Sequence, residues 1–342
     1  MTKRRKPNPD AAATIIDQKA AVAHDGITPI PQRIQVKPAF EERYRALLGD
    51  RYDAFLDHSL AYARKAIRVN TLKITVPALV KRLERDWILT PVPWCPEGFF
   101  ISYRHGKRFD IGNLPEHQLG YIYVQDPASM IPPVVLRPEA GETVLDLCAA
   151  PGSKTTQLAA RMRNRGVLVA NDVSGDRLKP LGLNLQRCGV ANTLVTVRAN
   201  RHFGPVFDRV LVDAPCSATG TVRRSLKALQ MWSPGFVTRM AAEQRRILEQ
   251  AWTLVKPGGT LVYSTCTLEP EEDEGQISAF LDKHLDAELL PVDLTINRSP
   301  AVLSFAGQEY RPEVAGCLRI GPQDNDTEGF FVAKLRKRLQ EP

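Results

Sequence analysis

The sequence has little of what marks secreted, membrane-spanning or metal-binding proteins. None of its apolar runs approaches the ~20 residues that span a bilayer, and the first residues, MTKRRKPNPD, contain no apolar signal core. Its six cysteines form no Cys-x-x-Cys pair and no cluster of histidines accompanies them, which disfavours a zinc site. We therefore expect a cytoplasmic protein with free thiols, no metal and no membrane partner.

The charge balance favours a polyanionic partner. Lysines and arginines total 46 against 38 acidic residues, a net charge of +8. The excess is uneven, because residues 61–110 hold ten basic and four acidic side chains. Such a patch favours binding of a nucleic acid, because each phosphate that it neutralises releases a counterion. On charge alone, a solvated basic face fits equally well.

The length of 342 residues suggests about two domains. We expect residues 1–37 to be a flexible basic arm, because they lack sustained apolar periodicity. Residues 38–125 then read as a small α+β domain that carries the basic excess. Its expected elements are helical spacing over 40–62, a strand at 67–72, a helix at 77–87 and a further strand at 94–103.

The second domain, residues 126–338, has a different pattern. Continuous apolar runs of strand length alternate with helical segments, and continuous rather than alternating runs indicate strands covered on both faces. The expected fold class is therefore α/β, a doubly wound, mostly parallel sheet that binds ligands at the carboxyl ends of its strands. The expected strands are 144–147, 167–170, 194–197, 210–212 and 260–263.

A tight turn follows the first of these strands. Residues 148–154, CAAPGSK, combine small side chains with Pro-Gly, so backbone N–H groups can approach a ligand. Asp172 ends the second strand and can accept hydrogen bonds from both ribose hydroxyls of an adenosyl ligand, although it could also cap the next helix. Turn and carboxylate together favour an adenosyl cofactor. The Gly-x-Gly-x-x-Gly dinucleotide fingerprint is missing.

Two cysteines follow adjacent strand ends near this turn. Cys216 lies in DAPCS at 213–217, with Asp213 directly after the fourth strand, and Cys266 lies in STCT at 264–267, after the fifth. Free cysteines are more often small buried hydrophobes within the fold. The position of Cys216 and Cys266 at the carboxyl ends of strands instead indicates a catalytic role.

Three of these motifs together closely resemble the Nop/Sun family of RNA cytosine-C5 methyltransferases. They are LDLCAAPGSKT at 145–155, DAPCS at 213–217 and YSTCT at 263–267. Other segments are similar to bacterial members of the family that modify small-subunit ribosomal RNA, so that the resemblance covers residues 40–338. These segments are IRVNTLK at 67–73, LTPVPWCPEGF at 89–99, VRR at 222–224, WSP at 232–234 and EGFFV at 328–332.

The resemblance implies a class I, Rossmann-like methyltransferase sheet behind a smaller N-terminal RNA-binding domain. It implies S-adenosyl-L-methionine as methyl donor and RNA as partner, and we expect a monomer. The implied cofactor-binding residues are Cys148, Ala149, Ala150, Pro151, Gly152, Ser153, Lys154, Asp172, Arg177, Asn200 and Asp213. The expected RNA contacts are Arg68, Asn70, Lys73, Arg223 and Arg224; for the last two, a solvated helix end is the alternative.

The implied chemistry is covalent catalysis. Carbon 5 of cytosine is a poor nucleophile, and a thiolate added to carbon 6 makes it reactive enough to take a methyl group. The resemblance makes Cys266 this nucleophile and Cys216 the residue that assists release of the product. Asp213, when protonated, can donate to ring N3. Lys154 could orient these groups or bind phosphate.

Two departures concern the adenine contact and the substrate. The family usually has Asp-Gly before a Phe after the third strand, whereas RANRHF at 198–203 puts Asn200 near that place. An Asn side-chain oxygen can still accept from the adenine amine. The ribosomal members continue into a further C-terminal RNA-binding region, whereas this sequence ends soon after Leu335. We expect ribosomal RNA in preference to transfer RNA.

Two other functions compete with this one. A catalytically silent RNA-binding or assembly factor could keep the fold, but would have no need for the pair Cys216 and Cys266. A nicotinamide-dependent oxidoreductase could use a similar sheet, but the missing dinucleotide fingerprint weakens that interpretation.

Overall fold

The computed structural model describes residues 14–16, 34–106, 108, 110–197 and 204–339. The expected basic arm therefore lies largely outside the described residues. Its last part does not: strand β2 (Ile34–Val36) pairs antiparallel with β1 (Thr14–Ile16), and Ile34 and Val36 are buried. The packed part of the chain thus includes β2, before the expected boundary at residue 37.

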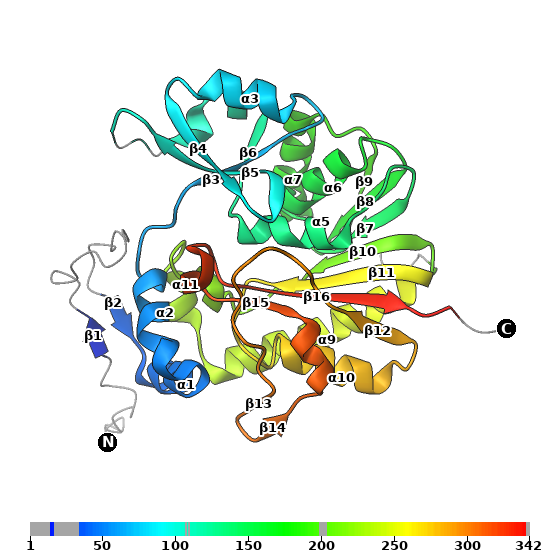
Figure 1. The fold of residues 1–342 in the computed structure, drawn as a ribbon. Coiled ribbons are helices and arrows are strands. Elements are labelled where there is room, and N and C mark those ends of the chain that lie inside the picture. Colours follow the sequence, from blue (N-terminus) through cyan, green and yellow to red (C-terminus); the bar gives the residue numbers. More distant parts are fainter. Residues whose placement is uncertain (1–13, 17–33, 107, 109, 198–203, 340–342) are drawn as a thin grey trace, which may run out of the picture.

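Two helices follow in place of the continuous helical segment expected over 40–62. They are α1 (Pro38–Leu48) and α2 (Tyr52–Ser59), separated at Gly49, whose φ of +53° favours glycine and ends the first helix. Phe40, Tyr44 and Phe55 from these helices form one buried cluster with Leu229 and Trp232, far along the chain. Figure 1 shows α1 and α2 apart from the N-terminal sheet, against the larger half of the molecule.

The N-terminal sheet has four antiparallel strands in the order β4-β5-β3-β6. The expected helix over 77–87 ends earlier, at Leu83, and Trp87 instead begins a strand that the sequence analysis missed. Its β-branched and aromatic residues fit a half-buried edge. The elements are β3 (Ala66–Val69), α3 (Val76–Leu83), β4 (Trp87–Val92), β5 (Cys95–Tyr103), α4 (Pro115–Gln118) and β6 (Ile122–Val124).

The larger sheet confirms the expected Rossmann-like α/β fold. Its strand order is β12-β16-β11-β10-β7-β8-β9, and the neighbours from β11 to β9 are parallel. Helices α5, α6 and α7 cover one face and α9 and α10 the other (Figure 1). The parallel part comprises α5 (Ile131–Leu136), β7 (Thr143–Asp146), α6 (Ser153–Arg161), β8 (Val167–Asp172), α7 (Gly175–Cys188), β9 (Thr193–Val197), β10 (Phe207–Asp213), α8 (Lys227–Met231), α9 (Pro234–Leu254) and β11 (Val255–Thr265).

The antiparallel side of this sheet was not expected. Strand β16 lies between β11 and β12 and runs antiparallel to both, and β15 also pairs with β16. The remaining elements are α10 (Glu274–Lys283), β12 (Ala287–Leu290), β13 (Ser304–Phe305), β14 (Gln308–Glu309), β15 (Leu318–Ile320), α11 (Pro322–Asn325) and β16 (Phe330–Lys337). Among the described residues, no helix has the length and apolar character to cross a membrane.

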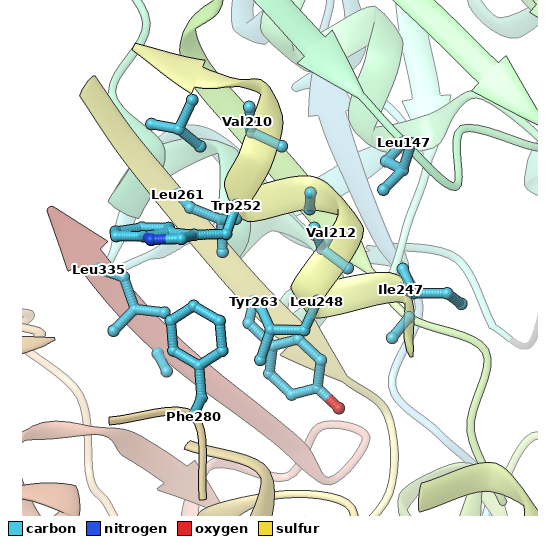
Figure 2. Close-up of a cluster of buried hydrophobic side chains, with 14 of the residues drawn as sticks. Leu147, Val210, Val212, Ile247, Leu248, Trp252, Leu261, Tyr263, Phe280 and Leu335 are labelled. Carbon is cyan, nitrogen blue, oxygen red and sulfur yellow. The ribbon is translucent and has the colours of Figure 1, made fainter. Parts of the chain in front are cut away.

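A hydrophobic cluster fixes β10 and β11 beside each other (Figure 2). Val212 and Tyr263 extend from the two strands, and Leu248 and Trp252 come from α9. Burial of a large apolar side chain contributes about 1.5–3 kcal/mol, so the cluster strongly restrains the two strands. Their carboxyl ends, which lead into the Cys216 and Cys266 segments, are thereby held side by side.

Candidate active site

The site lies where the strand order reverses, between β7 and β10. In open α/β sheets the crevice at this point, outside the carboxyl ends of the strands, is where ligands bind. A pocket of about 170 Å³ opens here. It is lined by Cys148, Ala150, Arg177, Asp213, Ala214, Pro215, Cys216, Ala218 and Cys266. The structure thus brings both strand-end cysteines together with part of the expected cofactor turn.

The turn after β7 has a backbone that a ligand can approach closely. Gly152 has φ of +104° at the start of α6, and a Cβ there would lie 2.8 Å from a methyl carbon of Leu181. Only glycine fits both restraints comfortably. The Asn184 side-chain amide donates to the Pro151 carbonyl at 2.9 Å, which ties the turn to α7.

Asp172 ends β8 and faces this turn. Its carboxylate accepts from the Ala150 N–H at 3.2 Å and lies 3.2 Å from the Arg177 guanidinium, which also donates to the Ala150 carbonyl. Its Oδ1 also accepts from the Ser174 N–H at 3.4 Å, just before α7. Helix α7 begins at Gly175, and the residue before it, Ser174, has no side-chain cap. Asp172 thus contacts both the turn after β7 and the residue before α7, and its role in holding a cofactor stays a prediction.

The cysteine sulfurs lie 3.3 Å apart, longer than the ~2.05 Å of a disulfide bond. Both thiols are free and partly exposed. The hydrogen bond to Cys266, followed by burial, holds the pKa of Cys216 well above its ordinary value. Cys216 therefore tends to keep its proton in this arrangement, and either sulfur can donate in the contact between them.

Asp213 is held from two sides. The Lys154 ammonium donates to Oδ2 at 2.7 Å, and the Ser264 hydroxyl donates to Oδ1 at 2.8 Å. Lys154 also donates to Ser129 at 3.1 Å. Burial alone would lower the pKa of Lys154, but the charge and hydrogen bond of Asp213, together with the nearby Cys266 and Asp146, outweigh burial and raise the pKa. Lys154 is thus held as a cation behind Asp213, which lines the pocket.

The segments after Cys216 and Cys266 are fastened to each other. The Thr267 hydroxyl lies 2.7 Å from the Ser217 hydroxyl and 2.9 Å from that of Thr219. The Gly220 N–H donates to the Cys266 carbonyl at 3.0 Å, and a Cβ on Gly220 would collide with the Gly329 carbonyl. These contacts join the segments that follow the two cysteines.

Two family models match this chain, each over a different range of residues. Residues 133–336 match the model of the 16S rRNA methyltransferase RsmB/F, and residues 36–127 match the N-terminal domain of the 16S rRNA methyltransferase RsmF. This chain belongs to the RsmB/F methyltransferase family. The resemblance read from the sequence motifs is thereby confirmed.

Relatives of this RsmB/F family member include both ribosomal and transfer RNA enzymes. The ribosomal RNA small subunit methyltransferase F of Erwinia tasmaniensis is 41% identical over 319 residues, 91% of this chain and 65% of that protein. The tRNA (cytosine(49)-C(5))-methyltransferase of Pyrococcus abyssi is 44% identical over 302 residues, 86% of this chain and 94% of that protein. The chain thus spans just under two thirds of the Erwinia relative.

Solved structures agree with the family. A methyltransferase homolog protein from Pyrococcus horikoshii superposes with a TM-score of 0.78 at 40% identity, covering 87% of this chain and 94% of that one. NSun6 from Pyrococcus horikoshii, determined with SFG, gives a TM-score of 0.73 at 25% identity, covering 87% of this chain and 97% of that one.

The expected RNA contacts need correction. Arg68, Asn70 and Arg223 are 1%, 1% and 5% exposed, and their side-chain donors bond within the fold rather than facing an open surface. Arg68 bonds the Ser153 carbonyl, Thr156 and Gln125, which fastens the N-terminal sheet to α6. The sequence pattern could not show this, because arginine is rarely buried and the partners lie far along the chain.

The other two buried side chains likewise bond within the fold. Asn70 donates to the carbonyls of Gly120 and Cys188, and Arg223 donates to the Thr327 and Tyr62 carbonyls and to Asp326. These groups stabilise contacts between distant segments of the RsmB/F family fold.

The other two expected RNA contacts, Lys73 and Arg224, are both exposed but differ in how firmly they are bound within the fold. Lys73 is exposed, yet its ammonium donates to the carbonyls of Leu119 and Arg187 at 3.0 and 2.8 Å. Arg224 is 74% exposed with one weak contact, to Glu328 at 3.6 Å, and stays available as an RNA contact. Asn200 lies outside the described residues. Within those residues, no group of side chains is arranged to hold a metal ion.

Sequence reasoning missed an acidic segment directly after Cys266. Glu269, Glu272, Asp273 and Glu274 are all fully buried. Arg319, itself 3% exposed, contacts Asp273 at 3.3 Å and Glu274 at 2.8 Å and donates to the Leu268 carbonyl. An acidic run normally predicts a solvated surface. Nothing local in the sequence indicates that distant cations and donors cover it.

Proposed function

We propose that this protein transfers a methyl group from S-adenosyl-L-methionine to carbon 5 of a cytosine in RNA, through a covalent bond between Cys266 and carbon 6. The observation that carries the proposal is the pair of free thiols 3.3 Å apart beside a pocket, next to Asp213. A catalytically silent scaffold would have no need for that arrangement, and the missing dinucleotide fingerprint weakens a nicotinamide-dependent oxidoreductase.

The residues at the strand ends fit the proposed cofactor. Asp172 offers a carboxylate for ribose hydroxyls, the Gly152 turn permits close backbone approach, and Asp213 and Arg177 line the same pocket. A family neighbour was solved with SFG, an analogue of S-adenosylmethionine. When bound, the cofactor would supply an electrophilic methyl group.

In the first half of the reaction, the Cys266 thiolate would add to carbon 6, forming the S–C6 bond and pushing the C5=C6 electrons into the ring. Carbon 5 could then take the methyl group. Asp213, when it carries a proton, would donate to ring N3, and Lys154 would compensate charge at the same edge.

In the second half, the proton on carbon 5 must leave and the S–C6 bond must break, which restores C5=C6 and the thiolate. The hydrogen bond to Cys266 is the largest cause of the raised pKa of Cys216. Once the Cys266 sulfur is bonded to carbon, that cause weakens. Cys216 would then lose its own proton to water more readily, and the resulting thiolate would accept the proton from carbon 5 as the S–C6 bond breaks.

We propose a division into an RNA-binding domain at 38–125 and a methyltransferase domain at 126–338, in a cytoplasmic monomer. Ribosomal RNA is the proposed substrate, because both matching models describe 16S rRNA methyltransferases. Transfer RNA is the competing substrate, since the Pyrococcus abyssi enzyme is matched over 94% of its length.

Bisulfite sequencing of total RNA from cells with and without the gene tests the proposal. A cytosine protected from conversion only when the gene is present identifies both the RNA and the position. Complementation with Cys266→Ala should not restore the protection. An unchanged pattern of 5-methylcytosine, with the protein still bound to RNA, would favour a silent binding factor instead.

A further inference from the structure

The buried carboxyl group of Glu272 is hydrogen-bonded to the segment that contains Cys216. Glu272 lies between β11 and α10 and is fully buried. Its Oε2 accepts from the Ser217 N–H at 2.9 Å and from the Gln244 side-chain amide at 2.7 Å. Ser217 directly follows Cys216, so this oxygen restrains the backbone on one side of the thiol.

Gln244 restrains the other side. The same amide nitrogen that donates to Glu272 also donates to the Pro215 carbonyl at 2.9 Å. Pro215 directly precedes Cys216, and Gln244 itself is fully buried on α9. The residues before and after Cys216 are therefore both bound, through Gln244 and Glu272, to one buried centre.

Cys266 is held by contacts in which Glu272 takes no direct part. Its carbonyl accepts from Gly220, and the hydroxyl of the preceding residue, Thr265, donates to Asp273 at 2.5 Å. Neither contact involves Glu272. A change at Glu272 should therefore move Cys216 more than Cys266.

We propose that Glu272 is a positioning residue for Cys216 that acts on release of the methylated product rather than on attack by Cys266. The inference rests on the proposed function. It predicts that methyl transfer survives the loss of Glu272, while the step that breaks the S–C6 bond is slowed.

The surroundings indicate that the acceptor oxygen, rather than the negative charge, performs this role. Burial raises the pKa of Glu272 to about 7, against the hydrogen bonds from Ser217 and Gln244. The titratable groups that face it, Glu269, Asp273, Cys216 and Tyr263, add no positive charge. Either protonation state offers Oε2 to both donors. Glutamine keeps such an oxygen and alanine does not.

The test compares Glu272→Ala with Glu272→Gln, with Glu271→Ala as the matched control. Glu271 is the neighbouring acid, but it pairs with Arg43 at 2.6 Å. Each protein is mixed in excess with labelled RNA and S-adenosylmethionine. Methyl incorporation in a single turnover and the covalent protein–RNA species on a denaturing gel are measured together.

Glu272→Ala should accumulate about 10- to 100-fold more covalent species than wild type, because a displacement near 1 Å can cost this much in one step. Single-turnover methyl incorporation should stay within about threefold of wild type. Glu272→Gln and Glu271→Ala should behave like wild type. If Glu272→Ala does not fold, Gln244→Leu removes the other contact and should give the same accumulation.

A folded Glu272→Ala or Gln244→Leu protein that loses methyl incorporation without accumulating the covalent species would overturn the inference. So would a Glu272→Gln protein as impaired as Glu272→Ala, or accumulation in Glu271→Ala. The activity of the wild-type protein distinguishes a failure of the role of Glu272 from a failure of the proposed function. If wild type methylates RNA, only the role of Glu272 is refuted; if it methylates none, the proposed function fails and the inference with it.

Discussion

Lys154 and Asp213 meet across the point where the strand order reverses, with the ammonium nitrogen 2.7 Å from Oδ2. Lys154 lies on α6, after β7, whereas Asp213 ends β10. Their side chains are 10% and 28% exposed, so solvent screens this ion pair only in part. The pair therefore fixes the direction of the Asp213 carboxylate at the pocket.

Replacing Lys154 should affect chemistry more than RNA binding. Lys154→Met keeps much of the side-chain volume but removes the cation beside Asp213. Single-turnover methyl transfer should fall about 100-fold, with RNA affinity nearly unchanged. Lys179→Met is the control, since Lys179 is 78% exposed on α7. Equal losses in the two variants would contradict a specific role for Lys154.

The two arginines Arg68 and Arg224 should separate stability from RNA binding. Arg68→Met removes donors from four acceptors, three of them buried, and should lower the free energy of unfolding by about 3 kcal/mol. Arg224→Ala should change stability by less than about 0.5 kcal/mol. It should reduce the slope of log affinity against log salt concentration by about 1.

Denaturant titration and RNA binding at several salt concentrations measure these effects. An Arg68→Met protein as stable as wild type would refute the structural role. An unchanged salt slope in Arg224→Ala would remove that residue from the RNA surface.

Glu269 joins α1 to the segment after Cys266. It accepts from Tyr44 at 2.9 Å, from Trp232 at 2.8 Å and from Arg43 at 2.7 Å. Glu269→Ala leaves buried donors unpaired and should cost about 3–5 kcal/mol of unfolding free energy. Glu271→Ala, a more exposed neighbour, should cost about 1 kcal/mol or less. Similar losses by denaturant titration would show that the buried contacts contribute little.

Glu272 gives stability a predictable pH dependence. Its pKa is about 7 in the folded protein and near 4.5 when unfolded. Between these values the folded state holds a proton that the unfolded state has lost, so this contribution to stability falls as pH rises from about 4.5 to about 7. Glu272→Gln removes the effect. Its unfolding free energy relative to wild type should rise by up to about 3 kcal/mol from pH 4.5 to pH 8. A difference independent of pH would contradict the raised pKa.

The sheet and the meeting of its strand ends could be predicted from the sequence. Continuous apolar runs mark parallel strands, and the carboxyl ends of such strands share one edge. For this reason Asp172, Asp213, Cys216 and Cys266 could be expected near one crevice before any coordinates. The chemical roles of these residues stay predictions.

Burial of charged residues could not be predicted. Arg68 and Glu269 have residue types that normally face water, and each is buried only because partners from distant segments pair with it. The antiparallel strand β16 was missed for a related reason. Its place between β11 and β12 depends on a long-range pairing that local apolar pattern does not encode.

The most direct test of the account compares Cys216→Ala with Cys266→Ala, each incubated with S-adenosylmethionine and substrate RNA and run on a denaturing gel. Cys216→Ala should show a slow-migrating covalent species, because carbon 6 is attacked but release is blocked. Cys266→Ala should show none and should transfer no methyl group. A covalent species formed by Cys266→Ala and not by Cys216→Ala would contradict the account, because it would make Cys216 the nucleophile.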